Sequence, residues 1–163
     1  MKRLLTATLT AIPFMLIAAC SSGEKDRQAL LARIDSLQEK ADAAYVPGTG
    51  EIMNSIVQPH HLKLWLAGTN NNWTLAAYEL HLLSGGFKRV EKFHKGSPEA
   101  TAVQMIYPEL DSLNDAIKAQ RKELFQKHFL LMTNTCNSCH QATNNPFVVI
   151  KVPEKELFSN QEF

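Results

Sequence analysis

The chain has 163 residues, 45% of them hydrophobic, and a formal net charge of +1 at neutral pH. This length suits a single domain, and the hydrophobic fraction is enough for a packed core. A chain so close to neutrality gives no reason to expect a nucleic acid or another strongly charged partner.

The N-terminus has the form of an export signal. Lys2 and Arg3 precede an almost uncharged apolar stretch from Leu4 to Ile17, and small residues follow it. The stretch is shorter than the roughly 20 residues that a membrane-spanning helix needs. The sequence therefore predicts a signal peptide over residues 1–19. Its removal takes away two positive charges and changes the formal charge from +1 to −1.

The end of this signal resembles a lipobox, because Ile17-Ala18-Ala19-Cys20 is followed by Ser21-Ser22-Gly23. The resemblance implies cleavage before Cys20 and acylation of that cysteine. The mature chain would then be a lipoprotein, anchored on the periplasmic side of a bacterial membrane. The alternative is an ordinary secretory signal that happens to contain a cysteine.

Residues 24–45 carry apolar side chains at heptad-type spacing, and residues 47–50, Pro-Gly-Thr-Gly, end the segment. This pattern predicts a lipid-tethered N-terminal helix and linker over residues 20–47. The helix would be a stalk between the lipid and the domain, or the coiled-coil contact of a homodimer. The apolar positions are Leu30, Ile34, Leu37, Ala41 and Ala44.

Four more helical segments follow this linker. The first covers residues 51–67 and contains Pro59, which is expected to kink it. Asn70, Asn71 and Asn72 make a turn and supply the N-cap of the second, which contains the Gly85-Gly86 pair. Two adjacent glycines in a helix suggest that a packed helix or a porphyrin edge approaches closely there.

The third segment begins at Ser97 and is interrupted by Pro108, and the last runs from residue 120 to about 142. Short connections between helices favour antiparallel neighbours. The sequence thus predicts an all-α chain. It would have an antiparallel four-helix bundle over residues 48–143, an extra N-terminal helix, and an irregular C-terminal tail over residues 144–163.

Cys136-Asn137-Ser138-Cys139-His140 lies at the end of the last helix and is a C-x-x-C-H motif, typical of c-type haem attachment. The two thiols would form thioether bonds to the haem vinyl groups, and His140 would be an axial iron ligand. Lipidation of Cys20 would leave these as the chain's remaining two cysteines. Export and covalent haem attachment also require the same compartment, outside the cytoplasm.

Other interpretations of the cysteine pair explain less. A thioredoxin-like redox pair should lie beside a βαβ pattern, and no strand-rich stretch surrounds this one. A structural zinc site needs four ligands. A plain disulfide, which an oxidising compartment permits, would leave His140 without a role. The sequence therefore predicts one covalently bound haem c.

The predicted bundle with its motif on the last helix resembles the class II c-type cytochromes, the cytochrome c′ group. Residues 58–68 and 72–80 are also similar to a set of uncharacterised bacterial proteins that end in C-x-x-C-H. The resemblance covers residues 48–143. It implies a haem held parallel to the bundle within its core, in a protein that carries electrons or binds small gases.

This chain differs from that family in its N-terminal helix and in the 23 residues that follow His140. Within this tail, residues 146–150 and 152–153 are apolar enough to pack on the bundle or to shield a haem edge.

The residue across the iron from His140 decides the function, since methionine or histidine closes the sixth coordination site and an apolar residue leaves it open. His140 lies at the end of the last helix, next to the start of the first bundle helix in an antiparallel arrangement. Met53 lies there and is the first candidate, with His61 and then His60 as alternatives. Met53 could instead fill the core, and either histidine could pair with a carboxylate.

The sequence thus predicts a periplasmic, lipid-anchored monohaem cytochrome that carries single electrons and is not an enzyme, with an unidentified redox partner. The alternative is a five-coordinate haem module that binds NO or CO as a sensor or scavenger.

Overall fold

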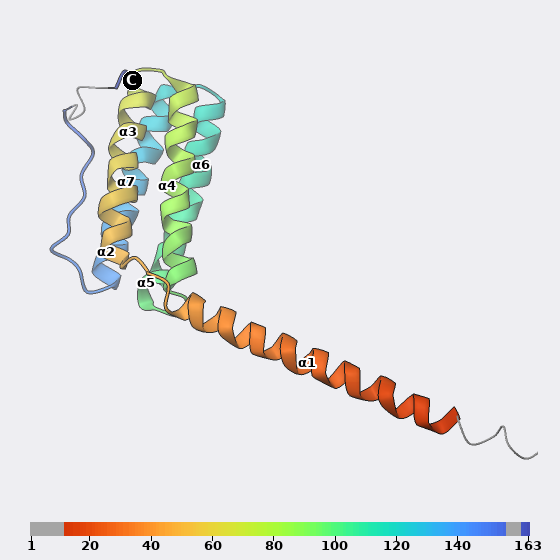
Figure 1. The fold of residues 1–163 in the computed structure, drawn as a ribbon. Coiled ribbons are helices and arrows are strands. Elements are labelled where there is room, and N and C mark those ends of the chain that lie inside the picture. The colour runs from red at the N-terminus through yellow and green to blue at the C-terminus, as the bar shows by residue number, and fades with distance from the viewer. Residues whose placement is uncertain (1–11, 156–160) are drawn as a thin grey trace, which may run out of the picture. The chain divides into compact units, whose positions relative to one another are not determined.

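A computed structural model describes the backbone of residues 12–155 and 161–163, with side chains from residue 23 onwards within those ranges. All regular secondary structure in these ranges is helical (Figure 1), which confirms the prediction of an all-α chain. The elements in chain order are α1 (Ile12–Asp42), α2 (Thr49–Ile52), η1 (Met53–Val57), α3 (Gln58–Thr69), α4 (Trp73–Phe93), α5 (Pro98–Ala102), η2 (Val103–Ile106), α6 (Tyr107–Lys118) and α7 (Lys122–Ala142).

The chain divides into two compact units, residues 1–45 and 46–163. The first contains α1, whose described side chains are all exposed, including Leu30, Ile34 and Leu37 of the apolar stripe. Residues 1–11 of the predicted signal and the side chain of Cys20 lie outside the described residues. Among the helices that the structure describes, none is long and apolar enough to cross a membrane.

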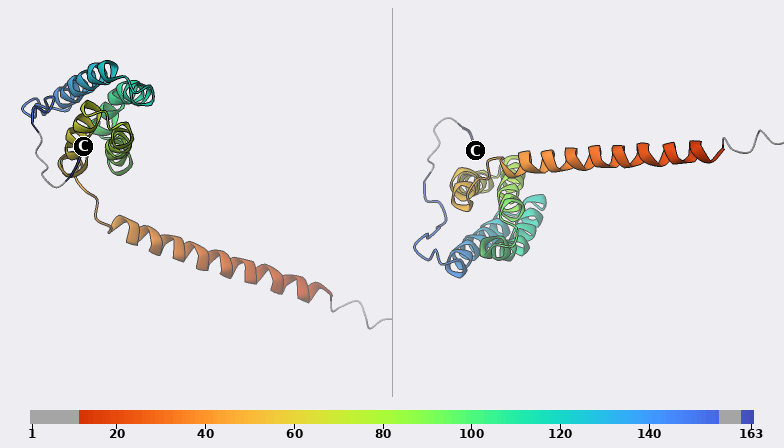
Figure 2. Two further views of the ribbon diagram at one scale, coloured as in Figure 1. Left: turned by 90° about the horizontal axis from the view of Figure 1, so that it is seen from above. Right: turned by 60° about the horizontal axis from the view of Figure 1, so that its bottom comes forward.

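In the second unit, α3, α4, α6 and α7 pack side by side (Figures 1 and 2). Helix α3 contacts α4 and α7, and α6 contacts the same two helices. Residues 70–72 join α3 to α4, and residues 119–121 join α6 to α7. These short connections make each of the two pairs antiparallel (Figure 1).

Local side-chain signals mark the beginnings of two helices. The Asn72 side chain accepts a hydrogen bond from the backbone N–H of Leu75 at 3.2 Å, and Ser97 accepts one from Ala100 at 3.1 Å. Each bond satisfies a donor that the first helical turn would otherwise leave unpaired. The cap expected at Ser97 is confirmed, and Asn72 is the one of the three asparagines that caps α4.

Aromatic side chains fill the contact between α3 and α7. The centroid of the Trp65 ring lies 4.9 Å from that of Phe129 and 6.3 Å from that of Phe125. Phe125 also contacts Gly68 so closely that a Cβ at position 68 would overlap its ring. Trp73 meets Phe125 edge-on at 6.1 Å. Both tryptophans therefore belong to the core of this unit.

Pro59 is accommodated by a wider helical turn. It lies in the first turn of α3, where its missing N–H costs little. The turn before it, η1, is π-helical, and the N–H of Gln58 bonds the carbonyl of Met53 five residues back. The segment predicted over residues 51–67 is thus α2, η1 and α3 in succession.

The two adjacent glycines of α4 differ in their surroundings. A Cβ at Gly86 would lie 2.7 Å from Cγ2 of Val57, whereas a Cβ at Gly85 would meet nothing within 4 Å. The close approach expected for this pair is confirmed for Gly86 and absent for Gly85, and the approaching group is a packed helical segment, η1.

We therefore expect opposite effects from the same substitution at these two positions. Gly85→Ala should raise the free energy of unfolding by about 1 kcal/mol, because alanine is the better helix former. Gly86→Ala should lower it by about 1–3 kcal/mol through overpacking against Val57. Urea unfolding followed by circular dichroism measures both, and equal effects would contradict the packing described here.

Candidate functional site

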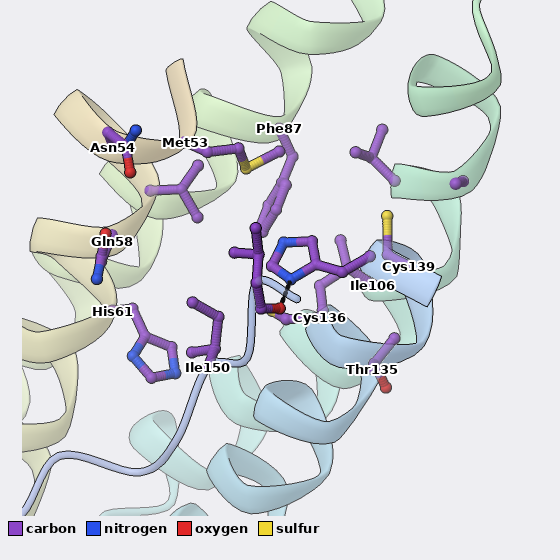
Figure 3. Close-up of a pocket in the computed structure, with 15 residues that line it drawn as sticks. Met53, Asn54, Gln58, His61, Phe87, Ile106, Thr135, Cys136, Cys139 and Ile150 are labelled. Atoms are coloured by element: carbon purple, nitrogen blue, oxygen red, sulfur yellow. Dashed lines mark hydrogen bonds between the residues drawn. The ribbon is translucent and has the colours of Figure 1, made fainter. Parts of the chain in front are cut away.

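A cavity lies where η1, α7 and the C-terminal segment meet, and Figure 3 shows the residues around it. Its enclosed space is about 70 Å³. The wall is mostly apolar, with a few sulfur, imidazole and amide groups. The lining residues are Met53, Asn54, Val57, Gln58, His61, Phe87, Ala102, Val103, Ile106, Thr135, Cys136, Cys139, His140, Val148 and Ile150.

The structure brings five of the predicted site residues to this cavity. Cys136, Cys139 and His140 come from α7, Met53 from η1 and His61 from α3. In Figure 3, Met53 and His61 lie on the opposite side of the cavity from Cys139.

His60, the third distal candidate, is not in this group. Its Nδ1 lies 2.6 Å from Oε2 of Glu79, a buried carboxylate on α4. His60 therefore pairs with a carboxylate, which was the alternative expected for it.

The π-turn explains why His61 lines the cavity and His60 does not. In a regular α-helix, residues seven apart lie on nearly the same face, so Met53 would share its face with His60. The π-turn takes up one more residue per turn and shifts this register by about one position. His61 is the residue that then lies on the cavity side with Met53.

The surroundings of Cys136 and Cys139 raise the pKa of both thiols. Both are unbridged in the structure. Burial raises the pKa of Cys136 to about 12, and burial together with the nearby Glu99 carboxylate raises the pKa of Cys139. Both are therefore protonated at neutral pH, whereas a redox-active C-x-x-C needs a thiol of lowered pKa. The raised pKa values of the two thiols therefore disfavour a thioredoxin-like role.

His140 is held in a single tautomer by the C-terminal segment. Its Nδ1 lies 2.7 Å from the backbone carbonyl oxygen of Val148, the contact drawn as a dashed line in Figure 3. A carbonyl can only accept, so Nδ1 carries the proton and donates. The lone pair of the neutral ring is then on Nε2. Metal-binding histidines are typically held in this way, with one ring nitrogen donating to a carbonyl and the other free to bind.

His61 is also held in one tautomer, but with the opposite nitrogen protonated. Its Nε2 lies 2.9 Å from Oγ1 of Thr133, which donates its own proton to the carbonyl of Phe129. Thr133 must therefore accept from Nε2–H of His61. Burial lowers the pKa of His61 to about 4, so the ring is neutral at pH 7. The lone pair of the neutral ring is then on Nδ1, so His61 could bind a metal through Nδ1, whereas binding through Nε2 would first break this hydrogen bond.

The donor groups at this cavity fit a covalently attached haem. Two thiols spaced by three residues on one helix, with an adjacent imidazole free at Nε2, are the groups that such attachment uses. The cavity holds about 70 Å³, and two adjoining cavities of about 310 and 560 Å³ share some of its lining residues. Across the described ranges, no group of three or more His, Cys, Asp or Glu side chains is placed to hold a metal ion.

Several contributors to the site were not anticipated from the sequence. Thr133 hydrogen-bonds His61, which lies 72 residues earlier in the chain. No local sequence pattern predicts such a contact. The carbonyl of Val148 belongs to a backbone whose path the sequence left open. Asn137 occupies a variable position of the motif. Its hydrogen bond to the C-terminal segment depends on the path of the same backbone.

Comparisons with protein families, with curated proteins and with solved structures give no significant match to this chain.

His61 should make the protein less stable in mild acid. Its pKa is about 4 when folded and about 6.5 when unfolded, so between these values the unfolded chain binds more protons. The free energy of unfolding then falls as pH falls, by up to about 2 kcal/mol from pH 7 to pH 5 for this group. His61→Gln keeps a hydrogen-bond donor that does not titrate. In urea unfolding it should reduce the decrease in the free energy of unfolding between pH 7 and pH 5 by about 2 kcal/mol. His81→Gln, at an exposed position, is the control and should leave it unchanged.

Proposed function

We propose that this chain is a periplasmic, lipid-anchored monohaem c-type cytochrome that carries single electrons and has no catalytic activity of its own. In this proposal α3, α4, α6 and α7 form the antiparallel four-helix bundle of a class II cytochrome. The observation that carries the proposal is the state of His140. Its ring is oriented by a carbonyl and free at Nε2, and it lines one cavity with both thiols and with Met53.

Covalent attachment would use the two thiols as the structure presents them. If haem were bound, each thiol would add its S–H across one vinyl group to form a thioether bond, with no leaving group. Cys136 and Cys139 are both unbridged in the structure, so both thiols are available for these bonds. The i, i+3 spacing places both on one face of α7, toward the cavity.

Bound haem supplies the one-electron exchange between ferric and ferrous iron. The chain would contribute the imidazole of His140 and the thioether of Met53, which line the same cavity. Methionine–histidine ligation is the arrangement of electron-carrying cytochromes c. Apolar side chains of Phe87, Val103 and Ile106 line the same cavity.

The same apolar wall favours a second candidate, the five-coordinate module that binds NO or CO. If Met53 only fills the core, as its packing against the buried cluster allows, the distal side is apolar and open to a small gas. The two candidates differ in one feature, the sixth ligand.

The membrane is a partner in this proposal through lipid on Cys20, while the protein that gives or takes the electron is not specified. A homodimer through α1 is compatible with the exposed stripe of Leu30, Ile34 and Leu37.

Covalent haem should depend on the two thiols. When the chain is exported with a haem-attachment system present, the purified protein should carry one haem that survives denaturation. Cys136→Ala together with Cys139→Ala should lose it, as judged by intact mass and the denatured absorption spectrum. Ser138→Ala, within the same motif, should keep it. A wild-type chain exported this way without covalent haem would refute the cytochrome proposal.

The sixth ligand can be identified from optical spectra. We expect a low-spin ferrous spectrum that CO does not alter, because Met53 occupies the distal site. Met53→Ala should open this site, giving a high-spin spectrum that shifts with CO. Met105→Ala, an exposed methionine away from the cavity, is the matched control. If the wild-type spectrum is high-spin and shifts with CO, the gas-binding module replaces the electron carrier. Unchanged low-spin ligation in Met53→Ala would instead point to His61.

A further inference from the structure

The C-terminal segment, residues 145–152, turns back along α7 after the haem motif. The turn occurs at Asn144, whose φ of +61° lies in the left-handed region that asparagine tolerates better than most residues. The backbone N–H of Asn145 then bonds the carbonyl of His140 at 2.7 Å. These contacts end α7 and direct the chain back over the cavity.

Asn137 fastens this returning segment to α7. Its side-chain Nδ2 donates to the carbonyl of Ile150 at 2.8 Å, and its Oδ1 accepts from the N–H of Ile150 at 2.8 Å. An amide side chain has a donor and an acceptor side by side and so satisfies both polar groups of one backbone residue. We call this pair of hydrogen bonds the Asn137 clamp.

The clamp lies next to the group that orients His140. Asn137 and His140 are three residues apart on α7 and therefore on neighbouring positions of one helix face. Their partners in the segment, Ile150 and Val148, are two residues apart. The same short piece of backbone makes both contacts, so loss of the clamp would free the carbonyl that holds Nδ1 of His140.

The segment also closes the cavity with alternate side chains. Val148 and Ile150 line it, and Val152 packs against the buried cluster. Phe147 and Val149 lie between and beside them and are 79% and 72% exposed. A segment with so little buried area depends on its polar contacts to stay in place.

We propose that Asn137 is a positioning residue, which fastens the C-terminal segment to α7 and thereby orients His140 through the carbonyl of Val148. The effect on the iron rests on the proposed function, whereas the clamp itself does not. A hydrogen bond from Nδ1 makes the imidazole a stronger ligand and fixes its plane. Residues Asn137 and Val148 would thus tune a metal that neither of them touches.

The first measurement follows the clamp by hydrogen–deuterium exchange of the haem-loaded protein. Asn137→Ala should speed exchange of the hydrogen-bonded N–H groups of Val148 and Ile150 by roughly tenfold or more, as expected for the loss of two ordinary hydrogen bonds. Ser138→Ala is the matched control, since its exposed hydroxyl bonds only the carbonyl of Asn134 in its own helix. Ile150→Pro removes the N–H of the clamp from the other side and leaves the motif intact. Unchanged exchange in both clamp variants would overturn the proposal.

The second measurement is the reduction potential of the same proteins. A weaker imidazole donor stabilises ferric iron less, so the potential should rise in Asn137→Ala and in Ile150→Pro but not in Ser138→Ala. Faster exchange with an unchanged potential would leave Asn137 as an anchor of the tail and overturn its positioning role. A wild-type chain without haem would refute the proposed function, and with it the effect on the iron. The exchange experiment on that chain would still decide whether the clamp exists.

Discussion

The contact between α3 and α7 is the interaction on which the site depends. Trp65 packs against the phenyl rings of α7, and Gly68 lets one of those rings come close. On the same interface, His61 is buried with its hydrogen bond to Thr133, a bond that would be costly to lose without a substitute. Because helices are stiff, this packing sets how the segment bearing Met53 faces the segment bearing the cysteine motif.

A second constraint acts along the chain before α3. Pro59 has no N–H to donate to the preceding turn, and the helix widens there into the π-turn η1. The wider turn changes which side chains share a face. It places His61 beside the cavity and leaves His60 with the buried carboxylate of Glu79. The neutral imidazole of His61 thereby lines the cavity, and His60 links α3 to α4 through Glu79.

The C-terminal segment determines which ring nitrogen of His140 carries the proton. Alone, the C-x-x-C-H supplies two thiols and an imidazole without settling which ring nitrogen is free. The returning backbone settles it, since the carbonyl of Val148 can only accept a hydrogen bond and Nδ1 of His140 must therefore carry the proton. Asn137, between the two cysteine positions, holds that backbone in place. The variable positions of the motif are therefore not equivalent, because Ser138 is exposed and bonds only within α7.

The sequence by itself determined the features whose causes are local. Apolar spacing, proline positions and the caps at Asn72 and Ser97 act within a few residues, so the helices were predictable with ends shifted by a few positions. The motif was equally readable, because its spacing lies within one helical turn. Tertiary structure alone decided which nitrogen of His140 is free and where the tail runs. Both depend on contacts between α7 and the returning C-terminal segment, and helical periodicity carries no information about them. The bond that joins His61 of α3 to Thr133 of α7 is a further contact of this kind.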